Sequence, residues 1–268
     1  MIDKRFVYTG SAVGLSARIT RIMKDSNVNQ VVPVQGASVL PQTGGISESR
    51  TGDYAHKIKH PEKRVVVKVG STKTRASGLP DGDLFRTEVS SEVTQVDFFD
   101  MLHIDSASVK MVSVHDGHND FPLVAPENVL IKGLRLGKTN VQVVFDLEPF
   151  QQCRTKRALA AKYATDPNFR KACAARFNAD PSSTVIPEYH GFFVASTVRE
   201  IKLVGETNPD ISINGYTIVW NGFGTIILGE MLISDYLRRF SLVRLKMGSD
   251  VGGDGTVSGV DGDSHTMP

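Results

Sequence analysis

The feature that most constrains this chain is a two-residue alternation of side chains that recurs along much of its length. Over residues 12–23, Val13, Leu15, Ala17 and Ile19 occupy alternate positions. Successive side chains of a strand point to opposite faces of a sheet, so this period predicts a half-buried strand. Further strand signals lie at residues 64–69, 83–99, 108–115, 129–136, 140–147, 192–203, 211–213, 216–220, 225–233 and 240–247. The chain is therefore expected to be mainly β.

The spacing of these runs predicts an antiparallel β-sandwich or barrel of about twelve strands rather than βαβ units. Two connections indicate hairpins, the short turn at residues 137–139 and the Asn214-Gly215 pair. Pro33 lies in the apolar run 31–34, and because proline cannot donate to a sheet ladder, this run predicts an edge strand or a bulge. Residues 36–61 are rich in Gly, Ser, Pro and charge and predict a long surface excursion.

One segment, residues 155–178, has the composition and spacing of helices instead. Phe169, Cys173 and Phe177 follow one another at intervals of four, which places them on one helical face. Asp166-Pro167 supplies an N-cap oxygen and a proline for the first helical position. We therefore expect a helical hairpin inserted between strands.

The last segment, residues 248–268, contains six glycines and four aspartates and almost no large apolar side chain. Such a segment buries too little surface to offset its chain entropy, which predicts a flexible tail. The chain then divides into an N-terminal β region (1–148), the helical hairpin insertion (149–181), a C-terminal β region completing the same core (182–247) and the tail (248–268).

Charge and composition exclude several classes of protein. With 31 Lys and Arg against 29 Asp and Glu, the net field does not favour a nucleic acid. The sequence has no apolar run long enough for a membrane span and no signal peptide at its start, so we expect a cytoplasmic or particle-associated protein. Two cysteines, Cys153 and Cys173, are too few for a secreted disulfide scaffold, and both one bridge and two free thiols stay open.

The sharpest local motif is the run 115–120, which contains His115, His118 and Asp120, with His103 and Asp105 upstream. Imidazole nitrogens and carboxylate oxygens suit zinc, iron, nickel or manganese, and a turn at residue 117 would bring several of them to one ion. An open coordination position could then activate water. The alternative is a turn in which Asp, Gly, Asn and His occur for backbone reasons.

Residues 116–123 resemble the DGHNDLP segment near the start of membrane dipeptidases. The resemblance implies that His118 and Asp120 are ligands of a binuclear metal site in a TIM barrel. That family needs further His and Glu ligands on later strands, whereas after residue 123 the only histidines of this chain are His190 and His265. Because the rest of the sequence shows antiparallel hairpins instead of βα units, we do not assign the chain to it.

Glu230 lies within the apolar run 226–233. A carboxylate buried there needs a partner, and Arg238, Arg239 or Arg244 would supply a bidentate one. The alternatives are a general acid or base with a raised pKa, or a side chain that Gly229 turns toward solvent.

These observations favour a non-enzymatic structural or interaction protein that self-assembles through edge strands and extended termini, as a shell, fibre or particle component. Its expected partner is another copy of the chain or another protein. The alternative is a metal-dependent hydrolase or metal-binding β-barrel, with a divalent transition metal held by His115, His118 and Asp120. A ligand-binding β-sandwich, for example for carbohydrate, is a third hypothesis.

Overall fold

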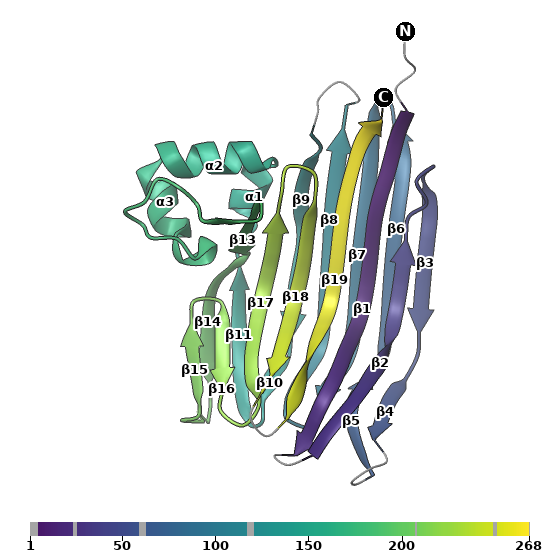
Figure 1. Cartoon of the computed structure of the whole chain (residues 1–268), viewed down its shortest axis with the longest axis vertical. Coiled ribbons are helices and arrows are strands. Elements are labelled where there is room, and N and C mark those ends of the chain that lie inside the picture. Colours follow the sequence, from purple (N-terminus) through teal and green to yellow (C-terminus); the bar gives the residue numbers. More distant parts are fainter. Residues whose placement is uncertain are drawn as a thin grey trace.

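The computed structural model of the protein describes residues 5–23, 26–58, 63–116, 121–206, 208–248 and 251–267. Within these residues the chain forms two antiparallel β-sheets that lie face to face, with short helices at one end (Figure 1). The sheets do not close into a barrel, so the sandwich is the architecture observed of the two expected. None of the helices in the described part of the chain is long and apolar enough to cross a membrane.

The first sheet has nine strands drawn from both ends of the chain. They are β1 (Arg5–Met23), β2 (Ser26–Val39), β12 (Glu188–Tyr189), β13 (Phe192–Ser196), β15 (Ile211–Asn214), β16 (Thr217–Trp220), β17 (Gly224–Ile233), β18 (Arg238–Met247) and β19 (Gly252–Met267). The spatial order is β12-β13-β17-β18-β19-β1-β2, and β16 pairs with β17 and β15. β2 is thus an edge strand, and its register with β1 places Pro33 and Val34 opposite the single residue Ser16. Both features expected around Pro33, an edge and a bulge, are confirmed.

The second sheet has ten strands, most of them from the first half of the chain. They are β3 (Gly45–Thr51), β4 (Tyr54–Ile58), β5 (Arg64–Val69), β6 (Ser71–Asp81), β7 (Leu84–Phe98), β8 (Leu102–His115), β9 (Leu123–Lys132), β10 (Leu134–Leu136), β11 (Thr139–Phe145) and β14 (Val198–Val204). The order is β14-β11-β10-β8-β7-β5-β4, with β6 and β3 continuing beside β7 and with β9 beside β8. The expected hairpins at residues 137–139 and at Asn214-Gly215 are both present.

The expected surface excursion over residues 36–61 is wrong, because most of this segment is strand. β3 pairs with β6 from Gly45↔Gly78 to Thr51↔Thr72, and β4 pairs with β5. The side chains of β3 alternate between half-buried and exposed, and none is fully buried. Backbone pairing at the edge of a sheet therefore orders a polar sequence that lacks the apolar alternation of a core strand.

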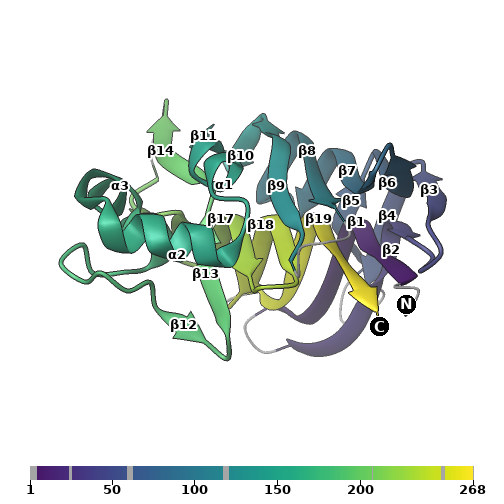
Figure 2. The ribbon, with the colours of Figure 1, turned by 90° about the horizontal axis from the view of Figure 1, so that it is seen from above.

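The helical insertion is confirmed, and it lies at one end of the sandwich (Figure 2). It consists of α1 (Glu148–Gln152), α2 (Lys156–Thr165), α3 (Pro167–Cys173) and a 3-10 turn (Ala175–Phe177). The carboxylate of Asp166 accepts hydrogen bonds from the backbone N–H groups of Asn168 and Phe169, so it caps α3 as expected. Cys153 and Cys173 are buried free thiols.

The expected flexible tail is also wrong. β19 lies in the interior of the first sheet, where it pairs with β18 on one side and with β1 on the other (Figure 1). Two kinds of contact order this glycine-rich segment. The Oγ of the buried residue Ser258 donates to the backbone oxygen of Ser91 across the sandwich at 3.0 Å, and the Phe98 ring lies about 3.5 Å from the position where Gly255 would carry a Cβ. Small residues thus let the two sheets approach closely, and two-sided backbone pairing replaces the large apolar side chains that the tail lacks.

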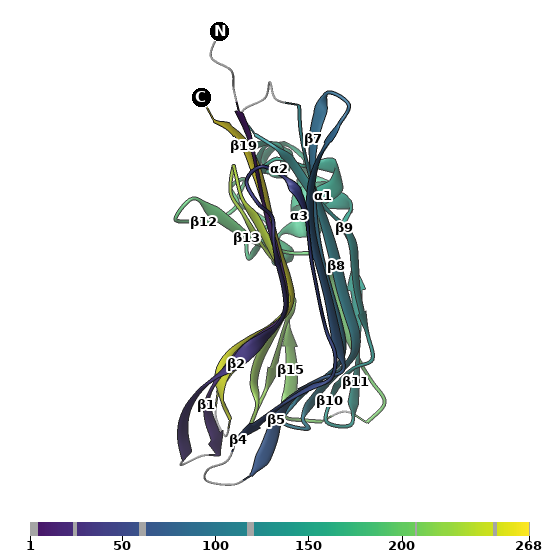
Figure 3. The same cartoon turned by 90° about the vertical axis from the view of Figure 1, so that its right-hand side faces the viewer.

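Both sheets bend part-way along their strands (Figure 3). In the second sheet, the registers place Asp53, Gly70, Gln95, Asp105 and Gly133 in one row across five neighbouring strand paths. We call this row the crease. It accounts for part of the excess of observed strands over the number predicted from the sequence, since β3 and β4, β5 and β6, and β9 and β10 are three paths interrupted where they cross it.

The side-chain alternation of the second sheet reverses at the crease. On one side of the crease, Val93 of β7 and Ala107 of β8 are buried. On the other side, the buried residues are Val96 and Ile104, which are three positions away along the same strands, whereas regular alternation would bury residues an even number of positions apart. Gln95 has a φ of +51° and Gly133 a φ of +63°, both in the left-handed region. A Cβ on Gly133 would lie 1.9 Å from the Oδ2 of Asp105, so this position requires glycine for space as well as for conformation.

Candidate functional site

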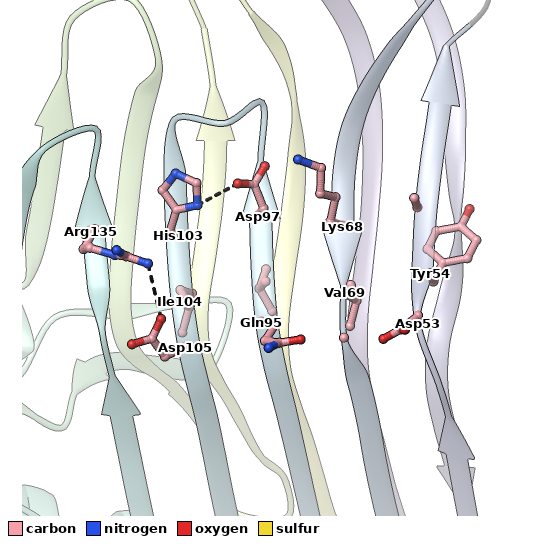
Figure 4. Close-up of a pocket in the computed structure, with 13 residues that line it drawn as sticks. Asp53, Tyr54, Lys68, Val69, Gln95, Asp97, His103, Ile104, Asp105 and Arg135 are labelled. Atoms are coloured by element: carbon pink, nitrogen blue, oxygen red, sulfur yellow. Dashed lines mark hydrogen bonds and ion pairs between the residues drawn. The ribbon is translucent and has the colours of Figure 1, made fainter.

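The crease carries a hollow of about 590 Å³ on the second sheet (Figure 4). Side chains from β4, β5, β7, β8 and β10 reach it, and the lining residues belong either to the crease row or to the adjoining stretch of these strands on one side of it. The polar and charged residues that line it are Asp53, Tyr54, Lys68, Gln95, Asp97, His103, Asp105 and Arg135.

An Asp–His pair lies at one side of this hollow. The Nδ1 of His103 lies 2.6 Å from the Oδ2 of Asp97, and the backbone N–H of Asp100 donates to the other carboxylate oxygen at 2.9 Å (Figure 4). Asp97 is thereby fixed, and it orients the imidazole of His103 through Nδ1. This is the arrangement of a general base, but the residues lining the hollow include no serine, threonine or cysteine that it could activate.

The two cations of the hollow, Lys68 and Arg135, each lie beside a carboxylate. Arg135 reaches Asp105 at 3.4 Å, and the Nζ of Lys68 lies 2.7 Å from Asp100. The hydrogen bond from Lys68 lowers the pKa of the Asp100 carboxyl below its ordinary value. The hollow therefore offers hydrogen-bonding groups of both kinds, and its lining includes the carboxylate of Asp53 beside these ion pairs.

The predicted metal site lies only partly within the described residues. His118 and Asp120 fall outside them. His115 ends β8 with its side chain 1% exposed, and its ring centroid lies 5.3 Å from that of Phe6. In the described part of the chain no group of three or more His, Cys, Asp or Glu side chains is placed to hold a metal ion. The metal site at His115, His118 and Asp120 stays a prediction.

Glu230 pairs with one of the three arginines that the sequence suggested as its partner. Its carboxylate Oε1 lies 2.5 Å from the Nη2 of Arg244, and the residue is 8% exposed. Arg238 instead donates to the backbone oxygen of Cys153 at 3.2 Å, and Arg239 lies 3.9 Å from Asp261. The sequence named the three candidates, and the cross-strand register of β17 and β18 selects Arg244.

A second candidate for function is the free edge of β2. This strand is fourteen residues long and contains no charged residue. Three of its valines, Val31, Val34 and Val39, are exposed, whereas Val32 is buried against the core. The sequence signal for this edge was Pro33, but the exposure of the valines depends on which strand lies beside β2.

A protein-family model described as "Domain of unknown function (DUF8256)" matches residues 6–180, which is more than half of the chain. The chain belongs to this family. No curated protein and no solved structure shows a significant match. The part that matches the family includes β1 and β2 and almost all of the second sheet, but β17, β18 and β19 lie beyond it. In this family member, the sandwich is therefore completed by strands outside the matched residues.

Proposed function

We propose that this protein is a structural or interaction protein that associates with a second copy of itself through the edge of β2. The observation that carries the proposal is the contrast between β2 and the other edge strands of the described structure. β12 and β15 have two and four residues, and the longer edge strands β3, β4, β9 and β14 all contain charged side chains. Charged residues and short length are the usual protection of an edge against pairing with another chain, and β2 has neither.

A two-fold axis would bring β2 against the same strand of a second copy in antiparallel orientation. Such an interface is isologous, and strand addition supplies it with backbone hydrogen bonds on both sides. Pro33 and the bulge divide the edge into residues 26–32 and 35–39. Because proline and bulges limit strand pairing, we assign the contact to the longer run, 26–32, which includes the exposed side chain of Val31.

Light scattering coupled to size-exclusion chromatography tests the proposal. We expect a particle of twice the chain mass of 29.2 kDa that dissociates on dilution. Val31→Lys places two like charges near the two-fold axis and is expected to weaken the dimer by at least about tenfold in Kd.

The matched control is Val185→Lys. Val185 is 68% exposed, against 69% for Val31, but it lies outside every strand. This variant should dimerise like the wild type. A monomer at about 100 μM, or equal weakening by the two lysine substitutions, would refute the proposal. Assembly into a fibre, shell or particle needs a second contact besides β2, and a mass well above that of a dimer would point to it.

A further inference from the structure

The Glu230–Arg244 pair lines a second hollow, of about 610 Å³, on the first sheet. β17, β18 and β19 form its floor, and Tyr216 from the turn between β15 and β16 and Asn178 from the end of the helical insertion also line it. The registers explain the floor, since Arg244 lies between Ile227 and Thr256 on the neighbouring strands and Glu230 lies opposite Ser241. Gly229, with a φ of +60°, reverses the alternation of β17, so that Ile227 and Glu230 both reach this hollow although they are three residues apart.

Two guanidinium groups line this hollow, and within the described residues neither makes its full set of hydrogen bonds. Arg244 bonds Glu230 through Nη2, while its Nε is buried and has no hydrogen-bond partner in the described structure. Within the described residues, the ion-pair partner of Arg239 is Asp261, at 3.9 Å, and Asp261 already accepts a hydrogen bond from Ser11. Among the lining residues, two cations face one carboxylate.

Tyr216 adds a third donor. The side-chain amide of Asn178 donates to the phenol oxygen at 2.7 Å, so the phenol proton is left to be donated elsewhere. Burial raises the pKa of Tyr216, which keeps this proton on the oxygen at neutral pH. The hydroxyl groups of Ser241 and Thr256 lie at the same hollow. Among the described residues that line the hollow, donors therefore outnumber acceptors, and Glu230 is the one carboxylate, with Asp261 just outside it beside Arg239.

We infer that this hollow binds an oxyanion, the phosphate or carboxylate group of a small molecule. Guanidinium groups match the geometry of both groups through paired N–H donors, and the buried phenol adds a donor of fixed direction. Arg239 is the accessible cation that an incoming anion meets, and Arg244 is the cation fixed behind it by Glu230. The site is independent of the β2 edge, since none of its residues belongs to β1 or β2.

Calorimetric titration with inorganic phosphate and, separately, with acetate tests the inference, at constant ionic strength set by sodium chloride. We expect saturable binding of at least one of the two anions, and the tighter one identifies the ligand group. Arg239→Gln should weaken binding by about tenfold, which is the loss of one charge-assisted contact. Glu230→Gln should strengthen it, because the substitution removes the competing negative charge from Arg244.

Arg135→Gln is the matched control. Its side chain is 48% exposed and lies 3.4 Å from an aspartate, against 56% and 3.9 Å for Arg239, but it belongs to the second sheet. It should leave anion binding unchanged. Equal melting temperatures in chloride establish that each variant is folded. Absence of saturable binding of both anions, or equal losses in Arg239→Gln and Arg135→Gln, would overturn the inference.

Discussion

Replacing Arg238 by methionine is expected to stabilise the protein. The side chain of Arg238 is almost fully buried, with 2% of the residue exposed, and no carboxylate within the described residues pairs with it. Its Nη2 donates to the backbone oxygen of Cys153 at 3.2 Å, and its Nη1 has no hydrogen-bond partner in the described structure. Burial, and then the nearby charge of Arg154, lower the pKa of Arg238 to about 10.

The size of the effect follows from this pKa. The fall of the pKa from the ordinary value of an arginine to about 10 corresponds to about 3 kcal/mol of unfavourable free energy for the charged form, at about 1.4 kcal/mol per pH unit. Methionine fills much of the same space as the arginine stem but loses the hydrogen bond to Cys153, which costs about 1.5 kcal/mol. The net expectation is a gain of about 1–2 kcal/mol in the free energy of unfolding, in the range found when unpaired or poorly paired buried charges are replaced.

Urea denaturation at pH 7 in a chloride buffer measures this difference. The midpoint should rise while the slope of the transition stays the same. The adjacent substitution Arg239→Met is the control, and it should change stability by no more than about 0.5 kcal/mol because that side chain is mostly exposed. A loss of stability in Arg238→Met would refute the reasoning, since it would show that the guanidinium has a favourable partner.

The pH dependence gives a second, independent test of the same reasoning. The folded state binds the proton of Arg238 less tightly than the unfolded state does, because its folded pKa is depressed. The penalty is therefore fully present below about pH 10 and declines as the pH rises through 10 toward the higher pKa of the unfolded state. The stability difference between the wild type and Arg238→Met should be constant near neutrality and should narrow in alkaline solution.

Three further predictions concern local structure. Gly133→Ala should lower the free energy of unfolding by at least about 1–2 kcal/mol in urea denaturation, and Asp105→Ala in the same chain should restore part of it, because the new methyl group collides with that carboxylate. Asp166→Ala should cost about 1 kcal/mol by the same assay, whereas Asp166→Asn, which keeps a capping oxygen, should cost less. Lys68→Met should raise the pKa of Asp100 in an NMR titration, since the hydrogen bond from Lys68 is the main cause of its depression; an unchanged pKa would show that the ion pair is absent in solution.

Much of the fold was predictable because the responsible interactions are local in sequence. Alternation over residues 83–99 and 108–115 reports which face of a strand meets the core, and the structure pairs these two segments as β7 and β8. The Asp166-Pro167 pair marks the start of α3, because the Asp166 side chain accepts hydrogen bonds from backbone N–H groups no more than three residues away. Such signals need no knowledge of neighbouring segments.

The segments that were interpreted incorrectly depend on distant neighbours. Residues 248–268 have the composition of a tail, and only the pairing of β19 with β1, more than two hundred residues earlier, makes Gly252–Met267 an interior strand. Two of the glycines that suggested disorder, Gly255 and Gly262, face side chains of the second sheet and allow it to come close. Residues 36–61 have the composition of a loop because the edge strands β3 and β4 within them do not need an apolar face.

The same division applies to the candidate sites. The sequence by itself determined that the chain is an antiparallel β protein with a helical insertion, that Pro33 marks an edge, and that Glu230 needs an arginine. Only the tertiary structure decided that Arg244 is that arginine, that β2 is the long uncharged edge, and that one residue from each of five neighbouring strand paths forms the crease. The physical reason is that alternation and turn chemistry act between residues a few positions apart, whereas strand order and register are set by the packing of the whole sandwich.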